Sequence, residues 1–259
     1  MFADLDLSDA RNHRFRSLHD CFTRELRDGA RPIHDAAGTL ISPCDGIVGA
    51  CGKIDGTLVL QAKGFPYGLT DLLLDPLLAE AHRDGLYVTL RLTSAMYHRF
   101  HAPADCRVEH VTYVSGDTWN VNPVSLRRIE RLFCKNERAI IQCRLDANGD
   151  PLTLVPVAAI LVASMRLTFV DVLLNLRYRG ANRMSCAAPL RRGGQMGWFE
   201  HGSTIIVLTP PGYALGDAVV PGAVVRMGEP LLKCLSVSQV RQTDAPEILG
   251  TSACQDTRP

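Results

Sequence analysis

The stretch GQMGWFEHGSTIIVLT, residues 194–209, decides how this chain folds around its candidate site. Its run Ile205–Leu208 is short, apolar and rich in β-branched residues, which is typical of a buried strand. Gly202 and Ser203 come directly before that run, at the start of the predicted strand. The peptide bond between them is therefore the candidate reactive bond.

A serine hydroxyl placed there can attack its own backbone. Oγ of Ser203 adds to the Gly202 carbonyl and shifts the acyl group from nitrogen to oxygen, and Gly202, having no Cβ, admits the backbone conformation required. Removal of the Ser203 Cα proton then eliminates the ester and leaves dehydroalanine, which hydrolyses to a pyruvoyl group. The same Gly-Ser-Thr also fits an ordinary turn leading into a core strand, so the rest of the chain has to decide.

Composition places the chain among globular proteins. Of its 259 residues, 46% are hydrophobic and 21% are charged, and the formal net charge is +1, which is not the charge pattern of a nucleic-acid-binding protein. The nine cysteines contain no CxxC pair, so we expect free thiols in a reducing cytosol and no metal site. The N-terminus has no apolar region of the signal-peptide type, and the longest apolar stretch, residues 152–165, is too short to span a bilayer.

Outside residues 194–209, most of the recognisable patterns in the sequence are those of β-strands. Residues 86–92 alternate, which predicts a strand leading into His98 and His101, and Asn148-Gly149 predicts a hairpin turn. Further strands are expected at 108–114, 139–145, 152–162 and 166–170, and hairpins at residues 41–64 and around 227–230. We predict an α+β fold that is mainly β, with a compact antiparallel β-sandwich or barrel-like core and a few peripheral helices. We expect the chain to form a single catalytic domain over residues 1–259, with a loose tail at 236–259.

Two helices and one long loop complete the expected fold. Residues 9–27 carry one apolar stripe beside several arginines, which predicts a helix that either packs on the body of the protein or lies on an anionic membrane surface. A second helix is expected to begin with Thr70 as its N-cap and to be bent or shortened by Pro76. Residues 177–197 lack periodicity, which predicts a long surface loop leading to Gly202-Ser203.

Activation of a serine needs a base within hydrogen-bond reach, and a histidine oriented by a carboxylate is the recurrent solution. The chain offers Asp45, His98 and His101 for this purpose. No spacing shows that they meet Ser203 in space, and a histidine at the end of a strand also fits a purely structural role.

Six ordered segments resemble the phosphatidylserine decarboxylase family of the bacterial type, over roughly residues 15–235. They are CFTRELRDGARPI at 21–33, SPCDG at 42–46, QAKGFPYGLTDLL at 61–73, YHRFHAP at 97–103, LFCKNERAI at 132–140 and GQMGWFEHGSTIIVL at 194–208.

The resemblance implies that Ser203 becomes a covalent pyruvoyl cofactor after cleavage from Gly202, leaving a β chain of 1–202 and an α chain of 203–259. It implies that Asp45 and His101 form a charge-relay set with Ser203 for this cleavage. His98 is implicated in decarboxylation, where it can return a proton to the carbon that loses CO₂. The pyruvoyl ketone forms a Schiff base with the substrate amine, and no metal is implied.

The activity implied is the conversion of phosphatidylserine to phosphatidylethanolamine and CO₂, by a zymogen that matures itself. The partners implied are the lipid substrate and the two associated chains, with no nucleic acid, and a homodimer stays open. The location implied is peripheral, on the cytoplasmic side of the cell membrane.

Departures from the family pattern leave alternatives open. His201 stands where the family has an apolar residue, Ala163 stands where it has glycine, and the chain begins close to the CFTREL segment. A decarboxylase of a soluble amino acid, or an unprocessed non-catalytic homologue, therefore remains as an alternative. Arg99, Lys63 and Arg138 are expected either to contact phosphate or to be structural.

Overall fold

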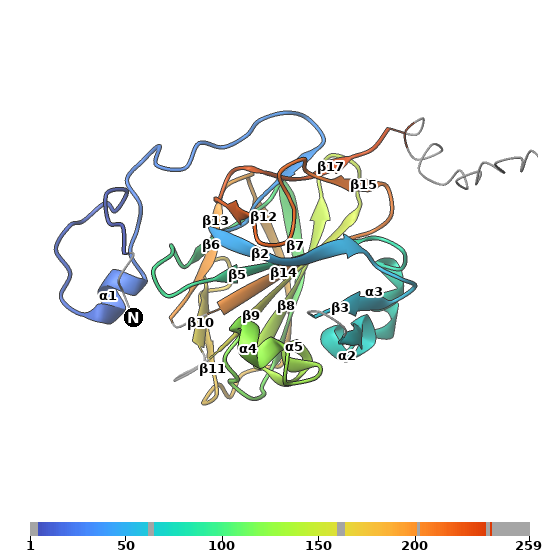
Figure 1. Cartoon of the computed structure of the whole chain (residues 1–259), viewed down its shortest axis with the longest axis horizontal. Coiled ribbons are helices and arrows are strands. Elements are labelled where there is room, and N and C mark those ends of the chain that lie inside the picture. Colours follow the sequence, from blue (N-terminus) through green and yellow to red (C-terminus); the bar gives the residue numbers. More distant parts are fainter. Residues whose placement is uncertain (1–4, 62–64, 160–163, 201–202, 237–238, 240–259) are drawn as a thin grey trace, which may run out of the picture.

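The strand predicted within residues 194–209 lies at the centre of the fold. The computed structural model describes residues 5–61, 65–159, 164–200, 203–236 and 239. In it, β14 (Ser203–Thr209) occupies the middle of an eight-stranded antiparallel sheet (Figure 1). All seven residues of β14 are buried. Both faces of β14 are covered, which explains why its sequence shows an apolar run rather than an alternation. The strands are, in spatial order, β12 (Arg183–Leu190), β7 (Cys106–Val114), β8 (Arg138–Leu145), β9 (Pro151–Ala158), β14 (Ser203–Thr209), β5 (Leu86–Leu92), β2 (Gly46–Lys53) and β16 (Val224–Val225).

Two smaller antiparallel sheets cover one face of the large sheet. Side chains of all three sheets, among them Leu90, Phe100, Phe199 and Ile205, form one apolar cluster, here called the sandwich core. The four-stranded sheet contains β11 (Val172–Asn175), β10 (Ser164–Leu167), β13 (Gln195–Phe199) and β6 (Arg99–His101), in that order. The three-stranded sheet contains β1 (Thr39–Ile41), β17 (Pro230–Cys234) and β15 (Tyr213–Leu215).

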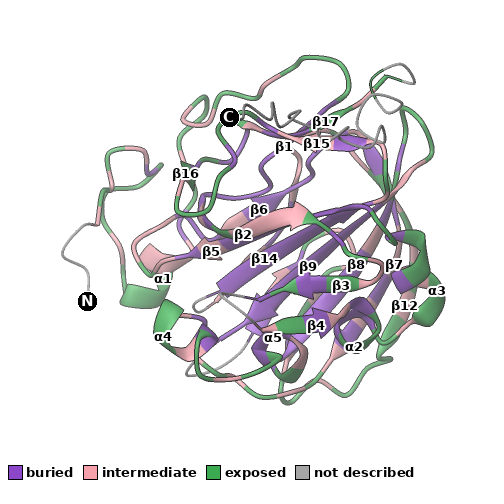
Figure 2. Ribbon diagram, turned by 45° about the vertical axis from the view of Figure 1, so that its right-hand side comes forward, coloured by how far each residue is buried: buried purple, intermediate pink, exposed green. Residues whose placement is uncertain are grey.

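Short helices and a hairpin cover the opposite face (Figure 2). Their apolar side chains meet Ile206 and Leu208 of β14 in a second cluster, here called the helix-side core. The elements are β3 (Leu58–Leu60), β4 (Pro66–Gly68), α2 (Leu69–Leu73), α3 (Pro76–Ala81), α4 (Pro123–Leu126) and α5 (Leu132–Lys135). The predicted class, a mainly β sandwich with a few peripheral helices, is confirmed.

Three connections between the large sheet and the four-stranded sheet have their ends next to one another. At the large sheet, Ser203 is paired with both Leu92 and Ala158. At the four-stranded sheet, the N–H of Phe199 donates to the carbonyl of His98 at 3.0 Å, and the N–H of Glu200 donates to that of Ser164 at 3.0 Å. The ends of β5, β9 and β13 therefore converge where β14 begins.

The predicted helix over 9–27 is wrong. Only α1 (Leu18–Phe22) is helical, begun by the Ser17 hydroxyl, which accepts from the N–H of Asp20. The flanking residues instead fold back on each other, because the N–H of Arg11 donates to Glu25 and that of Arg27 donates to Asp9, both at 2.9 Å. These backbone pairs replace the helical hydrogen bonds that a single long helix would need.

The helix predicted after Thr70, bent or shortened by Pro76, is two helices. Leu74 adopts a left-handed conformation at φ 52°, which ends α2. The Asp75 side chain then accepts from the N–H groups of Leu77 and Leu78, and Pro76 takes the first position of α3. Proline begins a new helix here because its fixed φ suits a first turn. The predicted cap is also wrong, since α2 begins at Leu69, after Gly68.

The predicted loop at 177–197 contains two strands, β12 and β13. β12 pairs with β7 at the edge of the large sheet, where Pro189 is tolerated. Its inward residues include the small Cys186 and Ala188, so the alternation of apolar and polar residues that marks a strand is weak in this sequence. The hairpin expected around 227–230 is also wrong, because β16 pairs with β2 while β17 pairs with β1 and β15. The predicted tail at 236–259 lies outside the described residues apart from Ser236 and Gln239.

Candidate active site

Ser203 begins the central strand and is fully buried. Its side chain lies on the sandwich-core face, as do those of its pairing partners Leu92 and Ala158. Oγ has no hydrogen-bond partner among the described residues. A buried hydroxyl without a partner costs free energy that folding alone does not reward. This feature points to a chemical use for the hydroxyl.

His98 lies at the end of the connection from β5 to β6 and is fully buried. Its ring stacks on Phe22, with the ring centroids 3.6 Å apart. Nδ1 lies 2.8 Å from the carbonyl oxygen of Met96, and because a carbonyl only accepts, Nδ1 carries a proton. Its backbone bond to Phe199 places His98 beside the segment that leads to the candidate bond.

His101 is buried, and the hydrogen bonds of its ring reveal its tautomer. Nδ1 lies 2.9 Å from the carbonyl oxygen of Gly193, so Nδ1 donates and Nε2 holds the lone pair. Nε2 lies 3.0 Å from the hydroxyl of Tyr97, which therefore donates to it. Burial lowers the pKa of His101 below 6.5, which keeps the ring neutral at pH 7. His101 is thus poised as a base.

Tyr97 is a residue that sequence reasoning did not single out. Burial raises the pKa of its phenol above 10, so the hydroxyl stays protonated while it donates to His101. The signal was present, because Tyr97 opens the YHRFH segment that supplied both histidines. Only the contact shows that it belongs to the site.

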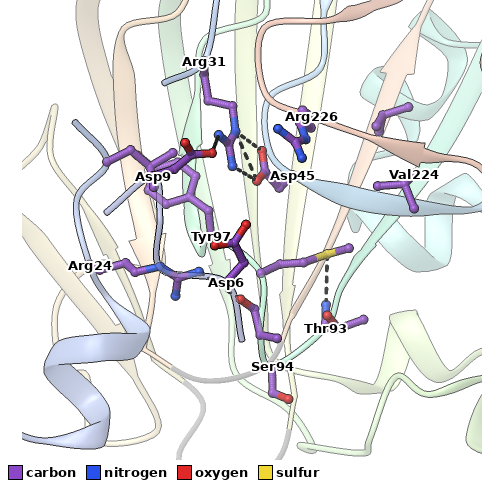
Figure 3. A pocket seen from close by; sticks show the side chains of 14 residues that line it. Asp6, Asp9, Arg24, Arg31, Asp45, Thr93, Ser94, Tyr97, Val224 and Arg226 are labelled. Atoms are coloured by element: carbon purple, nitrogen blue, oxygen red, sulfur yellow. Dashed lines mark hydrogen bonds and ion pairs between the residues drawn. The ribbon is translucent and has the colours of Figure 1, made fainter. Parts of the chain in front are cut away.

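Asp45 is held by a buried arginine (Figure 3). Arg31 donates from Nε to Oδ1 at 2.9 Å and from Nη2 to Oδ2 at 2.6 Å, and the side chains are 8% and 10% exposed. The N–H of Met227 adds a third bond to Oδ1 at 2.9 Å. Burial alone would lower the pKa of Arg31, but hydrogen bonds and charge from Asp45, with help from Asp9, raise it above its usual value. Arg31 was also missed from the sequence.

The relay implied by the resemblance, from Asp45 to His101, is not a direct hydrogen bond in the part of the chain that the structure describes. The carboxylate bonds Arg31 and Met227, while the ring bonds Gly193 and Tyr97. The charge of Arg99 disfavours protonated His101 and lowers its pKa, and the charge of Asp45 opposes that effect in part. The N–H of His101 also donates to the carbonyl of Pro43 at 2.8 Å, which sets β6 beside the segment carrying Asp45.

A polar cavity of about 410 Å³ lies beside these residues (Figure 3). Asp45, Tyr97 and Arg31 form part of its wall, and Arg226 contributes an exposed guanidinium. Arg24 also lines the cavity and donates to the carbonyl of Ala95 at 2.9 Å. The cavity therefore gives water and ions access to the Asp45 side of the site.

Two of the three expected phosphate contacts are structural. Arg138 is buried and donates to four backbone carbonyls, those of Asp71, Leu72, Cys134 and Asn136. Arg99 donates to the carbonyl of Thr23 and to Gln195. Lys63 lies outside the described residues, as do Gly202, His201 and Ala163.

Glu137, next to Arg138, is a buried acid that sequence reasoning did not select. Burial raises its pKa from 4.5 to about 7. Its carbonyl accepts from the N–H of Ala158 at 2.8 Å, and Ala158 is paired with Ser203. Glu137 therefore lies two strands from Ser203 at the same end of the large sheet.

Two further features bear on the kind of site. Within the described ranges, no group of three or more histidine, cysteine, aspartate or glutamate side chains could hold a metal ion. No helix among those residues combines the length and apolar character needed to cross a bilayer.

Comparison with known proteins identifies the relatives of this chain. The family model described as phosphatidylserine decarboxylase matches residues 18–233. A phosphatidylserine decarboxylase proenzyme of Haemophilus influenzae is 36% identical over 235 residues, covering 87% of this chain and 80% of the relative. Proenzymes of the same name from Erwinia tasmaniensis and Methylibium petroleiphilum are 35% and 37% identical, over 85% and 87% of this chain and 76% and 81% of the relatives.

Proposed function

This chain belongs to the phosphatidylserine decarboxylase family, and from that premise we propose that it cleaves itself between Gly202 and Ser203 and converts phosphatidylserine to phosphatidylethanolamine and CO₂. One observation carries the proposal. The hydroxyl of Ser203 is buried and unpartnered among the described residues, at the first position of the central strand and directly after Gly202.

The residues at this position fit the pyruvoyl group that the family implies. Residue 203 is held by β14 between Leu92 and Ala158, so the strand would keep a new chain end in place. The orphaned hydroxyl supplies the atom that the maturation chemistry consumes. When present, the group supplies a ketone conjugated to an amide, which accepts the electrons released with CO₂.

His101 and its neighbours serve self-cleavage. The Tyr97 hydroxyl gives up its hydrogen bond to Nε2 of neutral His101, and Nε2 then takes the proton of Ser203 as Oγ bonds to the Gly202 carbonyl carbon. The proton then passes to the departing amide nitrogen as the C–N bond breaks. The charge of Asp45 stabilises the imidazolium formed meanwhile, and Arg31 keeps Asp45 in place.

His98 serves the decarboxylation step. Its carbonyl bonds the backbone just before the candidate bond, and its Nδ1 proton is committed to Met96. We assign Nε2 the return of a proton to the substrate carbon that loses CO₂. Stacking on Phe22 fixes the ring plane for this transfer.

The α chain from 203 onward would stay bound without the peptide bond. β14 lies between β5 and β9, which both belong to the β chain, and every residue of β14 is buried. β16 pairs with β2, and β17 pairs with β1, so further strands of the α chain also pair with the β chain. Separation would expose a central strand of the sheet on both faces, which is strongly unfavourable.

A peripheral membrane contact, on the cytoplasmic side, is proposed through the segment around α1. Leu18 is 73% exposed, and Arg14 and Arg16 beside it are exposed as well. An exposed apolar side chain flanked by cations suits the surface of an anionic bilayer. Flotation with phosphatidylserine-containing vesicles should weaken in Leu18→Ser but not in Leu77→Ser, which removes an even more exposed leucine from α3. Equal flotation of both variants would contradict this contact.

Maturation and activity are tested together. Denaturing intact-mass analysis of the purified protein should show two chains divided between 202 and 203, and a hydrazine should label the smaller chain. The same preparation should release CO₂ from phosphatidylserine in detergent micelles but not from free L-serine. Ser203→Ala should remain one unlabelled, inactive chain, whereas Ser185→Ala, at an exposed serine of β12, should mature normally. An active, uncleaved Ser203→Ala protein would refute the proposal.

A further inference from the structure

A second cavity lies on the other face of the large sheet, next to the candidate bond. It has a volume of about 160 Å³ and is lined by β5, β14 and β2 together with Phe133 and Leu126 of the helix-side core. Thr204, the residue after Ser203, is in its wall. Because neighbouring residues of a strand point to opposite faces, this cavity approaches residue 203 from the side away from the sandwich core.

The cavity wall contains buried hydroxyl groups that have no hydrogen-bond partner among the described residues. The hydroxyls of Thr89 and Thr204 are buried, in residues 2% and 0% exposed, and neither has a hydrogen-bond partner among the described residues. Arg91 is paired directly with Thr204 across β5 and β14, so its side chain lies on the same face. Two buried hydroxyls in one cavity with a guanidinium form a set of donors for an anion.

No negative charge in the described structure balances this site. Arg91 makes no ion pair or side-chain hydrogen bond with any described residue, and burial lowers its pKa with no neighbouring charge to offset it. No aspartate or glutamate is among the lining residues, while Arg127 adds a second, exposed cation. A half-buried guanidinium without a counter-ion is costly, and a bound anion would remove that cost.

The other polar wall residue is already satisfied. The amide nitrogen of Gln61 donates to the carbonyls of Leu126 and Ile129, at 3.0 and 2.6 Å, and its oxygen accepts from the N–H of Leu132 at 2.5 Å. Gly49 sits at an irregularity in β2, and a Cβ there would contact the Thr89 carbonyl oxygen at 3.6 Å. Its missing side chain leaves space beside Thr89.

The position of the cavity matches the chemistry of the substrate. Consecutive Cα atoms are about 3.8 Å apart, so Thr204 is next to Cα of residue 203, the carbon that becomes the reactive ketone. In a phosphatidylserine headgroup, only one carbon and one oxygen separate the reacting α-carbon from the phosphodiester. We propose that Arg91, Thr89 and Thr204 bind the phosphodiester of the substrate headgroup, an inference that rests on the proposed function.

The test separates binding of the headgroup from maturation. Arg91→Met should still divide into two chains and react with a hydrazine, but its KM for micellar phosphatidylserine should rise about tenfold or more, with Arg91→Lys between the two. Thr89→Val keeps the side-chain shape and should raise KM severalfold, which covers the case in which Arg91→Met fails to fold. Arg107→Met, at an exposed arginine of β7, should behave as the parent protein.

Inorganic phosphate is the second probe, because a free anion could use the same donors. It should inhibit the parent protein competitively with phosphatidylserine and lose this effect in Arg91→Met. Loss of phosphate inhibition with an unchanged lipid KM would mean a free-phosphate site and would overturn the proposal. The proposal would also be overturned if Arg91→Met and Thr89→Val were cleaved and labelled but kept the parental KM; the proposed function would then still stand. A parent protein that is inactive on phosphatidylserine would instead defeat the proposed function itself.

Discussion

Replacement of Arg31 by methionine tests how Asp45 is held. The change removes the paired bonds to Asp45, at 2.9 and 2.6 Å, and a further bond to Asp9 at 2.8 Å. Methionine fills similar space without charge, so the carboxylate of Asp45, 10% exposed, keeps the N–H of Met227 as its one hydrogen-bond donor among the described residues. The buried carboxylate then loses its counter-ion.

The expected loss is large because the pair is buried. Removing one partner of such a pair typically costs about 3–5 kcal/mol, and in a domain of this size each kcal/mol shifts Tm by about 2–4 °C. Arg31→Met should therefore lower Tm by about 6–20 °C. Arg11, which pairs with Glu25 and Asp28 at an exposed position, provides the matched control. Arg11→Met should cost under about 1 kcal/mol.

Thermal unfolding followed by circular dichroism measures both variants. The Ser203→Ala background is used so that every sample is one uncleaved chain and Tm refers to the same reaction. In the Ser203 background, Arg31→Met should also mature more slowly, as seen by intact mass, because Asp45 is no longer oriented. The reasoning is refuted if Arg31→Met and Arg11→Met lower Tm equally, or if Arg31→Met matures at the parental rate.

Three further predictions follow from buried groups. Burial lowers the pKa of His82 from 6.5 to about 4. About 3 kcal/mol of stability present above pH 6.5 should therefore be lost as the pH falls to about 4. Denaturant titrations at the two pH values should show a smaller loss in His82→Gln than in the parent protein. Burial raises the pKa of Glu137 to about 7, so stability is lost as pH rises from 4.5 through 7. Glu137→Gln should therefore be more stable than the parent protein at pH 8 but not at pH 4. An equal gain in stability at both pH values would contradict this. A Cβ on Gly197 would collide with the Arg166 carbonyl oxygen, so Gly197→Ala should cost about 1–3 kcal/mol and slow maturation, whereas Gly68→Ala, with an ordinary contact, should change Tm little.

Much of the sheet could be predicted because strand signals are local. Residues 86–92 alternate with the period of a strand, and Asn148-Gly149 marks the turn between β8 and β9, as the structure confirms. β12 was missed because two of its inward side chains, Cys186 and Ala188, are small and its outward ones include proline. The 9–27 segment was misread because its apolar spacing fits a helix, while backbone pairing between its two ends wins in the fold.

The candidate site divides in the same way. Ser203 at a strand start, and the histidines after the strand 86–92, follow from patterns within a few residues, and the ordered motifs identified the family. The roles of Asp45, His98, His101 and Ser203 stay predictions. Arg31 and Tyr97 were missed because neither has a local pattern that separates it from the other arginines and tyrosines.

The sequence by itself determined the mainly β class, the buried strand with Ser203 at its start and the family, since hydropathy period and motif order are properties of neighbouring residues. Tertiary structure alone decided that Arg31 holds Asp45, that Tyr97 bonds His101, and that Arg91 and Thr204 share a cavity. Thr204 and Arg91 are more than a hundred residues apart and meet because β14 pairs with β5 in one register. Register depends on the packing of both faces of the whole sheet, which no local pattern contains.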